Sequence, residues 1–314
     1  MRAEVLTIGE AMAAVRCAGP LRLGGASRIS VAGAEFNVAI ALARLGHAAR
    51  WAGAVGEDEP GELVRRTLRA EGVLTDAVIR RTDAPTGLLL RDVAPGGRAR
   101  VSYYRTGSAA SALSWEDIRP AADHGFAGLH LTGITPALGP APLAAVTVAA
   151  DQARNRGSWV SLDVNHRSLL WTRDAAARAL RPLLPQVTVL IASDDELAIV
   201  ADGDGERDRV EALLDAGVEE VVIKRGAAGA SYRDARTSLD APALAVPVVD
   251  VVGAGDAFTA GYLSGRLDGL DAHGRLERAT LLGAACVACD GDWEGLPTRD
   301  ELPALRLRAG DTLR

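Results

Sequence analysis

Hydrophobic residues along the chain fall into short runs that alternate with longer amphipathic segments, a pattern typical of βαβ units around a parallel sheet. Five runs are predicted to be strands: 5–8, 128–131, 159–163, 187–192 and 220–224. Six segments are predicted to be helices: 37–45, 62–71, 142–156, 175–184, 206–216 and 257–267. We therefore expect an α/β fold in which helices cover both faces of a mainly parallel sheet.

Two segments, 13–32 and 84–107, depart from this rhythm because polar and apolar residues alternate within them. A turn at Pro95, Gly96 and Gly97 separates two predicted strands of the second segment, and both segments are predicted to be hairpins without a helix. An antiparallel element of this kind often covers a site at the carboxyl ends of parallel strands. The pattern predicts a discontinuous β lid, 13–32 and 84–107, and a core made of residues 1–12, 33–83 and 108–314.

Composition and charge narrow the class of protein. Hydrophobic residues make up 48% and charged residues 24% of the 314 residues, which excludes disordered and collagenous classes. The net charge is −6 and no basic stripe is present, so we expect no nucleic-acid partner. Residues 126–150 lack Asp, Glu, Lys and Arg, but Pro136, Pro140 and Pro142 interrupt them. We expect a buried strand, a loop and a helix start there, and no membrane partner.

Cysteine usage favours a reducing compartment. Cys17, Cys286 and Cys289 are too few and too unevenly spaced for a disulfide framework, and Glu4 and Glu10 interrupt the apolar N-terminus where a signal peptide would be uniformly apolar. We therefore expect a cytoplasmic protein. Cys286 and Cys289 are expected to be buried on one helical face and not to form a redox or metal pair.

One glycine-rich turn offers phosphate chemistry. Lys224 is the only lysine and no GxxxxGK[ST] surrounds it, which excludes a Walker A loop. Gly253-Ala254-Gly255-Asp256 instead stands directly before the predicted helix 257–267, where free N–H groups and the helix dipole attract an anion. Asp256 either caps this helix or accepts a proton from a hydroxyl that attacks a phosphoryl group.

Two motifs resemble those of the ribokinase-like (PfkB) carbohydrate kinases. The segment 250–258, DVVGAGDAF, is similar to their C-terminal motif, and AGAEFN at 32–37 with ARLG at 43–46 is similar to their N-terminal one. The resemblance extends from about residue 6 to about residue 297. It implies a three-layer αβα core with a small β-sheet lid, ATP and Mg²⁺ as cofactors, and a catalytic group made of Asp256, Gly253, Ala254 and Gly255.

The resemblance also implies which residues hold the nucleotide and the metal. Residues 193–196 are similar to the family's NxxE motif with Ser193 in place of asparagine, which implies that Glu196 holds Mg²⁺ through water. A capping or surface role for Glu196, and a plain turn at 224–229, are the alternatives, and a monovalent cation is a further requirement that stays open. The implied nucleotide-binding residues are Asn165, Arg167, Ser193, Lys224, Gly226, Gly229, Gly253, Ala254 and Gly255.

The acceptor is inferred from segments 101–111, 162–171 and 291–297, which resemble the 2-keto-3-deoxygluconate kinase branch. A sugar acid carries a carboxylate, which Arg105 and Arg167 can bind by charge-assisted hydrogen bonds; the alternative is that each is a solvated surface residue. Tyr103 shares a strand face with Arg105, whereas Leu89 stands where this branch is expected to place an aromatic residue. The implied substrate-binding residues are Gly33, Ala34, Asn37, Tyr103, Arg105, Arg167, Asp256 and Asp292.

The sequence thus predicts an ATP-dependent kinase that phosphorylates the terminal hydroxyl of 2-keto-3-deoxygluconate. The alternative enzyme is a fructokinase or another neutral-sugar kinase, and the alternative of another class is an inactive sensor of a sugar acid or nucleotide. The retained Asp256 favours the enzyme, because a sensor needs no base beside an anion site. We expect a homo-oligomer, since exposed edges of the lid can be covered by a second copy. The sequence leaves the epimer and the nucleotide preference open.

Overall fold

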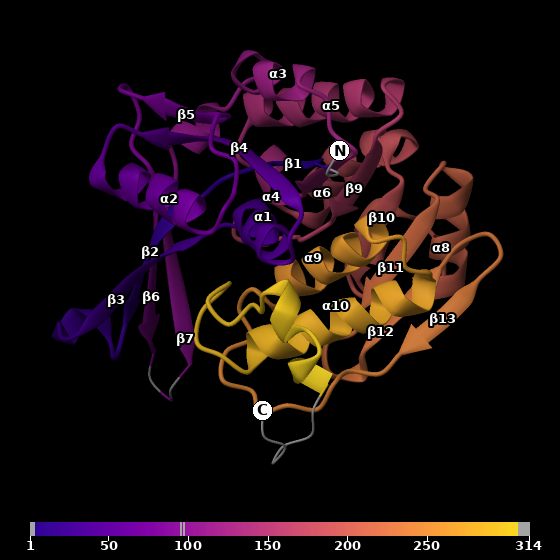
Figure 1. Cartoon of the computed structure of the whole chain (residues 1–314). Helices are drawn as coiled ribbons and strands as arrows, with labels where there is room; N and C mark the ends of the chain where they lie inside the picture. Colours follow the sequence, from indigo (N-terminus) through magenta and orange to yellow (C-terminus); the bar gives the residue numbers. More distant parts are fainter. Residues whose placement is uncertain (1–3, 95, 97, 307–314) are drawn as a thin grey trace.

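The computed structural model describes residues 4–94, 96 and 98–306 and shows a large sheet between helices beside a smaller sheet (Figure 1). The large sheet has nine strands in the order β13-β12-β11-β10-β9-β8-β1-β4-β5. Neighbouring strands are parallel except at β11–β12 and β12–β13, which are antiparallel. The strands are β1 (Glu4–Ile8), β4 (Ala48–Gly56), β5 (Val78–Arg81), β8 (Gly128–Thr132), β9 (Trp159–Asp163), β10 (Val189–Ser193), β11 (Glu220–Lys224), β12 (Ala230–Arg233) and β13 (Ser238–Ala241).

Helices cover both faces of this sheet and complete three layers. One face carries α1 (Ala34–Arg44), α2 (Glu59–Ala70), α9 (Ala254–Leu267) and α10 (Ala272–Val287). The other carries α3 (Trp115–Asp123), α5 (Pro140–Asn155), α6 (Arg173–Leu180), α8 (Glu206–Asp215) and the short helix α7 (Leu197–Val200). The short helix α4 (Ile134–Ala137) follows β8. The predicted ribokinase-like αβα fold is confirmed.

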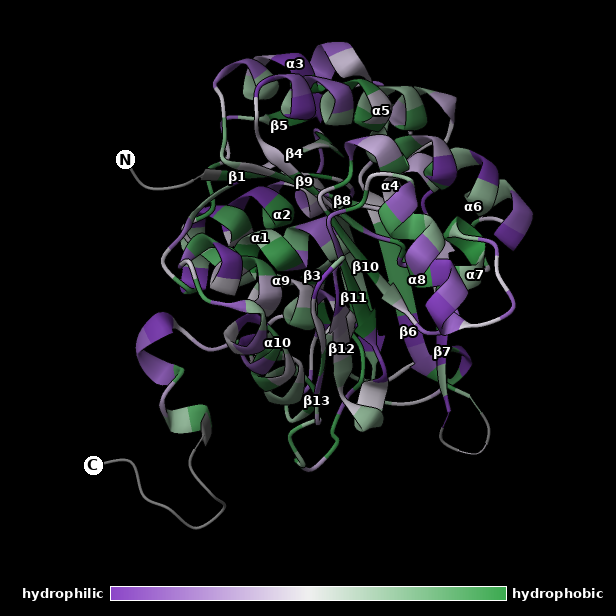
Figure 2. Ribbon diagram, turned by 90° about the vertical axis from the view of Figure 1, so that its right-hand side faces the viewer, coloured by the Kyte–Doolittle hydropathy of each residue, from purple (hydrophilic) through white to green (hydrophobic). Residues whose placement is uncertain are grey.

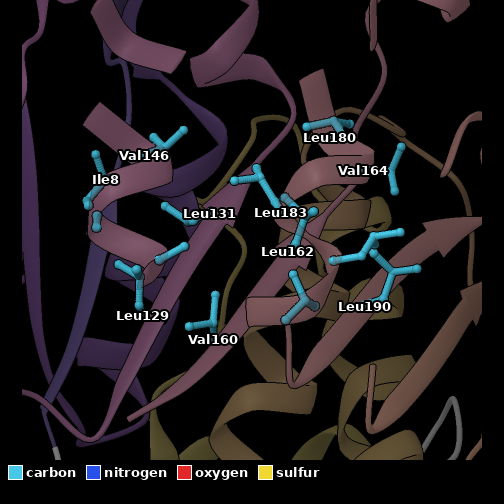
Figure 3. Packing of buried hydrophobic residues seen from close by; sticks show 14 of the residues in the cluster. Ile8, Leu129, Leu131, Val146, Val160, Leu162, Val164, Leu180, Leu183 and Leu190 are labelled. Atoms are coloured by element: carbon cyan, nitrogen blue, oxygen red, sulfur yellow. The ribbon is translucent and has the colours of Figure 1, made fainter. Parts of the chain in front are cut away.

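Alternating strand residues supply the two cores. In β1, Leu6 and Ile8 pack into the cluster beneath α5, whereas Val5 packs into the cluster beneath α1, because successive side chains point to opposite faces. Figure 3 shows the first cluster, which includes Leu129 and Leu162 of neighbouring strands and Val146 of α5. The inner strands β10 and β11 are coloured as hydrophobic in Figure 2, while the outer surface of α8 is largely hydrophilic. This packing fixes the carboxyl ends of the parallel strands along one edge.

A second sheet of four strands, in the order β3-β2-β6-β7, lies beside the core. It comprises β2 (Met12–Cys17), β3 (Ser27–Ala32), β6 (Gly87–Val93) and β7 (Ala99–Tyr104). Strands β2 and β6 pair in parallel, so the two predicted hairpins join into a single sheet. The expectation of no helix within 13–32 was wrong, because the short 3-10 helix Leu21–Leu23 connects β2 to β3. Pro95 and Gly97 of the predicted turn, and the ends of the predicted core at 1–3 and 307–314, lie outside the described residues.

The predicted elements differ from the observed ones mainly at their ends. Strands 159–163 and 220–224 are confirmed to the residue, whereas the strand expected from residue 187 begins at Val189. The helix expected at 175–184 ends at Leu180 and continues as a 3-10 helix, Arg181–Gln186, because Pro182 and Pro185 cannot donate helical hydrogen bonds. Strand β4 was not predicted, because its alanines and glycines give no clear alternation.

The segment 126–150 forms the buried strand β8 and the start of α5, as predicted, but the short helix α4 lies between them where a loop was expected. None of the helices in the described ranges is long and apolar enough to cross a membrane. The expectation for Cys289 was wrong: α10 ends at Val287, so Cys286 is buried while Cys289 is exposed.

Candidate active site

The glycine-rich turn forms an open anion site at the start of α9. Gly253 precedes the helix with φ +80°, and a Cβ there would lie 2.2 Å from the carbonyl oxygen of Asp292, so this position requires glycine. The amides of Gly255 and Asp256 donate no hydrogen bond within the described part of the chain. Two free N–H groups and the helix dipole therefore point to a negatively charged ligand.

Asp256 is a buried carboxylate held by two amides. Asn37 Nδ2 donates to Asp256 Oδ2 at 2.8 Å, and Asn165 Nδ2 donates to Oδ1 at 3.4 Å. Burial raises the pKa of Asp256. The hydrogen bond from Asn37 and the positive charge of Arg167 lower this pKa but only partly offset the effect of burial. No side chain caps α9, so Asp256 does not serve as a helix cap. A carboxylate with a raised pKa beside an anion site is suited to accept a proton.

Asn165 adopts an unusual backbone conformation, with φ +39° in the left-handed region. This conformation lets a residue two positions after the end of β9 direct its amide toward Asp256. The resemblance implied a nucleotide contact for Asn165, whereas the structure places it on the carboxylate.

One pocket collects most of the predicted substrate-binding residues. It opens between α1, the N-terminus of α9 and the inner face of the second sheet. Eight predicted residues line it: Gly33, Ala34, Asn37, Tyr103, Arg105, Arg167, Asp256 and Asp292. The pocket thus unites residues from both motifs and from the segments similar to the 2-keto-3-deoxygluconate kinase branch.

The two arginines of this pocket differ in their surroundings. Arg105 is buried and forms an ion pair with Glu10, a partner that the sequence did not predict. Its guanidinium also lies 5.3 Å from the ring of Tyr103, within the range of a cation–π contact. Arg167 is exposed and forms no side-chain hydrogen bond or salt bridge with any described residue. Arg167 therefore offers the unpaired positive charge of the pocket.

Asp292 meets the second sheet through Arg16 of β2. Arg16 Nη2 donates to Asp292 Oδ1 at 2.6 Å, and both side chains are buried. Burial, assisted by Asp256, raises the pKa of Asp292 to about 7 despite the charge of Arg16. Asp292 thus lines the pocket and fixes β2 against the core.

Lys224 lies under the glycine-rich turn and is already paired. Its Nζ donates to both carboxylate oxygens of Asp163 at 2.7 Å, and it lies 3.6 Å from the position of a Cβ on Gly255. Burial alone would lower the pKa of Lys224, but Asp163 and Glu196 hold it above its usual value. A permanent positive charge therefore supports the anion site from below.

The loop after β11 contains Gly226 and Gly229, with φ +53° and φ +97°. A Cβ on Gly229 would lie 2.0 Å from the carbonyl oxygen of Ala241, so the backbone alone accounts for this glycine.

Glu196 is buried, which excludes a surface role, but it makes the capping contact of the other alternative by accepting from the amide of Ser193, three residues earlier. Its Oε1 accepts from the amide of His166 at 2.7 Å, and its Oε2 accepts from the amide of Ser193 at 2.8 Å. The Ser193 hydroxyl donates to Asp195. No cluster of three or more metal-ligating side chains occurs among residues 4–94, 96 and 98–306. The carboxylate of Glu196 is an oxygen donor of the kind that holds Mg²⁺, directly or through water.

Sequence reasoning missed several pocket residues, of which Glu10 and Glu35 matter most. Glu35 Oε1 accepts from Thr132 Oγ1 at 2.6 Å and from Thr135 Oγ1 at 2.7 Å, while its Oε2 has no partner among the described residues. An acidic residue inside the AGAEFN motif was a signal of a buried role that could have been used. The other missed lining residues are Met12, Ala32 and Ile134.

A free-amide turn, a buried carboxylate beside it and a pocket beneath a β-sheet lid together define a small-molecule kinase. The chain belongs to the pfkB family of carbohydrate kinases, whose family model matches residues 2–299. It is therefore a phosphotransferase that acts on a sugar hydroxyl and uses ATP and Mg²⁺.

Several relatives are similar over nearly the whole chain. The 2-dehydro-3-deoxygluconokinase of Bacillus subtilis (strain 168) is 35% identical over 96% of this chain and 95% of its own. The 2-dehydro-3-deoxygluconokinase of Thermoproteus tenax is also 35% identical, over 91% and 88%. Among solved structures, a putative ribokinase II from E. coli in complex with ATP and Mg²⁺ is 25% identical, with a TM-score of 0.91 over 96% of this chain and 98% of that chain.

Proposed function

We propose that this kinase transfers the γ-phosphoryl group of ATP to the terminal hydroxyl of 2-keto-3-deoxygluconate or a close 2-keto sugar acid. The observation that carries the proposal is that the unpaired guanidinium of Arg167 lines the same pocket as the buried carboxylate of Asp256. Relatives named 2-dehydro-3-deoxygluconokinase, another name for a kinase of this acid, support the same substrate class.

Asp256 serves as the general base. It removes the proton from the attacking hydroxyl as the oxygen–phosphorus bond forms and the bond to the leaving diphosphate breaks. Asn37 and Asn165 hold both carboxylate oxygens, which fixes the direction in which the base faces the pocket. The raised pKa of Asp256 makes it a better proton acceptor than an ordinary exposed aspartate.

The glycine-rich turn receives the transferred group. The free amides of Gly255 and Asp256 hydrogen-bond its equatorial oxygens, with Lys224 beneath them. Glu196 would hold Mg²⁺ through water, beside the oxygens of the phosphates. The bound ion would neutralise the negative charge of these phosphates. Further nucleotide contacts are proposed for Ser193, Gly226, Gly229, Gly253 and Ala254.

The carboxylate of the acceptor binds the arginine side of the pocket. Arg167 supplies the unbalanced charge, while Arg105 is oriented by Glu10 and Tyr103 so that its remaining N–H groups are available. A neutral sugar would leave Arg167 without a partner in a closed site, which disfavours it. Fructokinases from Klebsiella pneumoniae and Escherichia coli are 33% and 32% identical, so a neutral-sugar kinase is the alternative outcome.

Three further proposals concern the molecule as a whole. The chain divides into a core of 1–12, 33–83 and 108–314 and a lid of 13–32 and 84–107. The edge strands β3 and β7 carry the exposed side chains Ile29 and Tyr104, which supports a homo-oligomer that covers these edges. Cys17, Cys286 and Cys289 are all free, which supports a reducing, cytoplasmic location.

The test is ADP release, coupled to an indicator enzyme, with a panel of acceptors. The panel contains 2-keto-3-deoxygluconate, its galacto epimer, gluconate, fructose and ribose. The proposal predicts the highest kcat/KM with a 2-keto sugar acid. A neutral sugar as the best acceptor would instead assign the protein to the neutral-sugar kinases.

A further inference from the structure

An arginine of the second sheet binds Asp250, which lies three residues before the glycine-rich turn. Arg91, on β6, binds Asp250 through both of its terminal nitrogens, with Nη2 donating to Oδ1 at 3.0 Å and Nη1 donating to Oδ2. The side chain of Asp250 is 3% exposed and that of Arg91 23% exposed, so the pair is shielded from water. The hydrogen bonds are bidentate, which fixes the relative direction of the two groups as well as their distance.

Asp250 organises the turn as well as binding the lid. Its Oδ1 accepts from the amide of Val252 at 3.1 Å, which bends the chain directly before Gly253. Its own amide donates to the carbonyl of Val287, at the last residue of α10. A change in the position of the Asp250 carboxylate must therefore change the path of residues 250–253, which lead into the anion site.

Strand β6 also contacts the acceptor pocket. Leu89 lines the pocket and stands opposite Tyr103 of β7 in the ladder, and Arg91 stands two residues further along. Side chains two residues apart share one face of a strand. The same face of β6 thus contacts the acceptor site through Leu89 and the phosphate turn through Arg91, with no flexible loop between them.

Asp92, the residue after Arg91, faces the other way, and its hydrogen bonds lie within the second sheet and its connection. It binds Arg100 of β7 and accepts from the amide of Leu21. Arg100 and Arg91 lie in the same sheet, and each forms two hydrogen bonds with one aspartate. The partner of Arg100, Asp92, lies in the second sheet itself, whereas the partner of Arg91, Asp250, lies next to the glycine-rich turn.

We propose that Arg91 is a positioning residue that acts through Asp250 to couple closure of the second sheet over the acceptor to the shape of the glycine-rich turn. Acceptor bound against Leu89 and Tyr103 holds β6 in place, and β6 then holds Asp250 and the turn in the geometry that receives the phosphoryl group. This inference rests on phosphoryl transfer at this pocket but not on the identity of the sugar acid.

Coupling of this kind is reciprocal. If the acceptor tightens the binding of nucleotide by some factor, nucleotide must tighten the binding of the acceptor by the same factor. Loss of the Arg91–Asp250 pair is expected to remove this mutual tightening of binding. Each ligand alone should still bind with nearly its wild-type affinity. Loss of a merely structural contact would instead weaken both ligands or lower the stability of the protein.

The experiment measures the dissociation constant of a non-hydrolysable ATP analogue with Mg²⁺ by calorimetry, in the absence and presence of saturating acceptor. The acceptor is whichever compound of the panel the wild-type enzyme turns over best, so an error in the proposed substrate does not affect the result. We expect about tenfold tightening in the wild type, within the usual range for coupled sites. In R91Q we expect less than twofold tightening, binding of each ligand alone within about twofold of wild type, and a lower kcat.

Three further variants make the result decisive. R91K keeps the positive charge but cannot form the bidentate hydrogen bonds of a guanidinium, so it should retain an intermediate coupling factor. The control R100Q should retain the wild-type coupling factor. The double variant R91Q/D250N should lose no more coupling than R91Q, because both substitutions break one link. The proposal is overturned if the wild type shows no tightening, if R91Q keeps the wild-type factor, or if R100Q loses it equally. Should R91Q fail to fold, R91K against R100K applies the same criterion.

Discussion

Three of the four buried carboxyl groups that line the pocket, those of Asp256, Asp292 and Glu35, have different partners and therefore different roles. Asp256 is held by two amides, Asp292 by an arginine of the second sheet, and Glu35 by two threonine hydroxyls. Burial raises the pKa of each of them. Only Asp256 lies beside free backbone amides, so we assign proton transfer to Asp256 alone.

Replacing Asp256 by asparagine should abolish turnover and spare binding. The amide keeps the shape of the carboxylate but cannot accept the proton, and loss of a general base typically costs ~10² to 10⁴ in rate. Steady-state kinetics give kcat, and calorimetry gives the affinities of the ATP analogue and the acceptor. If D256N kept more than about half of the wild-type kcat, Asp256 would not be the base.

Glu35 should make the folded protein less stable as the pH rises. Burial, only partly offset by hydrogen bonds from Thr132 and Thr135, raises the pKa of Glu35 from 4.5 to about 7. The native state therefore keeps a proton that the unfolded chain loses between pH 4.5 and pH 7, and stability falls across this window. A pKa shift of this size contributes roughly 3 kcal/mol to the free energy of unfolding. This contribution is present below pH 4.5 and is lost above pH 7.

Substituting Glu35 by glutamine removes this titration and retains an acceptor for the threonines. We expect the stability of E35Q relative to wild type to rise between pH 5 and pH 8, as measured by urea unfolding. The control is E116Q, because the side chain of Glu116 is 74% exposed. Parallel pH curves for E35Q and wild type would contradict the raised pKa.

At the scale of elements, the start of α9 depends on a backbone conformation and a close approach at Gly253. In G253A the Cβ would meet the carbonyl oxygen of Asp292, and the left-handed conformation would itself cost about 1–2 kcal/mol. We expect a rise in the KM for ATP and a loss of at least about tenfold in kcat, because the anion site is displaced.

Gly269, at the other end of α9, provides the matched control. It has φ +73°, close to that of Gly253, but a Cβ there would meet nothing within 4 Å. G269A should therefore lose a comparable amount of stability in thermal unfolding and keep its turnover. Equal losses of activity in the two variants would mean that backbone strain alone explains the effect of G253A.

The sequence predicts those elements whose signal is local. Strands 159–163 and 220–224 are short apolar runs bounded by polar residues, and the glycine-rich turn is marked by residues that follow one another. Strand β4 was missed because it is rich in alanine and glycine and is recognised as a strand only through its pairing with β1. The parallel pairing of β2 with β6 likewise depends on register across a long stretch of chain.

The same distinction applies to the site. Asn37 and Asp256 could be inferred to meet because both lie in motifs of one family. The pairs Arg105–Glu10 and Arg91–Asp250 join residues that are 95 and 159 positions apart in the chain. The local sequence therefore does not indicate which acidic residue pairs with each arginine. Prediction of a charged residue near the pocket was therefore feasible, whereas prediction of its partner required the fold.

At the scale of the whole molecule, the core built on the nine-stranded sheet carries Asp256 and the glycine-rich turn at the start of α9, and the four-stranded sheet forms one side of the pocket. Two arginines of the four-stranded sheet bind aspartates of the core. Arg16 pairs with Asp292, and Arg91 pairs with Asp250. Neither sheet completes the site alone, so chemistry depends on their approach. Acceptor selectivity should consequently depend on whether the acceptor satisfies charge on both sides of the pocket.

The central claim is that a carboxylate of the acceptor is recognised by Arg167. The most direct measurement is the ratio of kcat/KM for 2-keto-3-deoxygluconate to that for fructose, in the wild type and in R167Q. A charge-assisted contact of ~3 kcal/mol corresponds to more than a hundredfold. The account predicts a ratio of at least about 100 in the wild type, which falls below about 10 in R167Q because turnover of the acid declines while that of fructose changes little. Comparable kcat/KM values for the two sugars in the wild type would contradict the account.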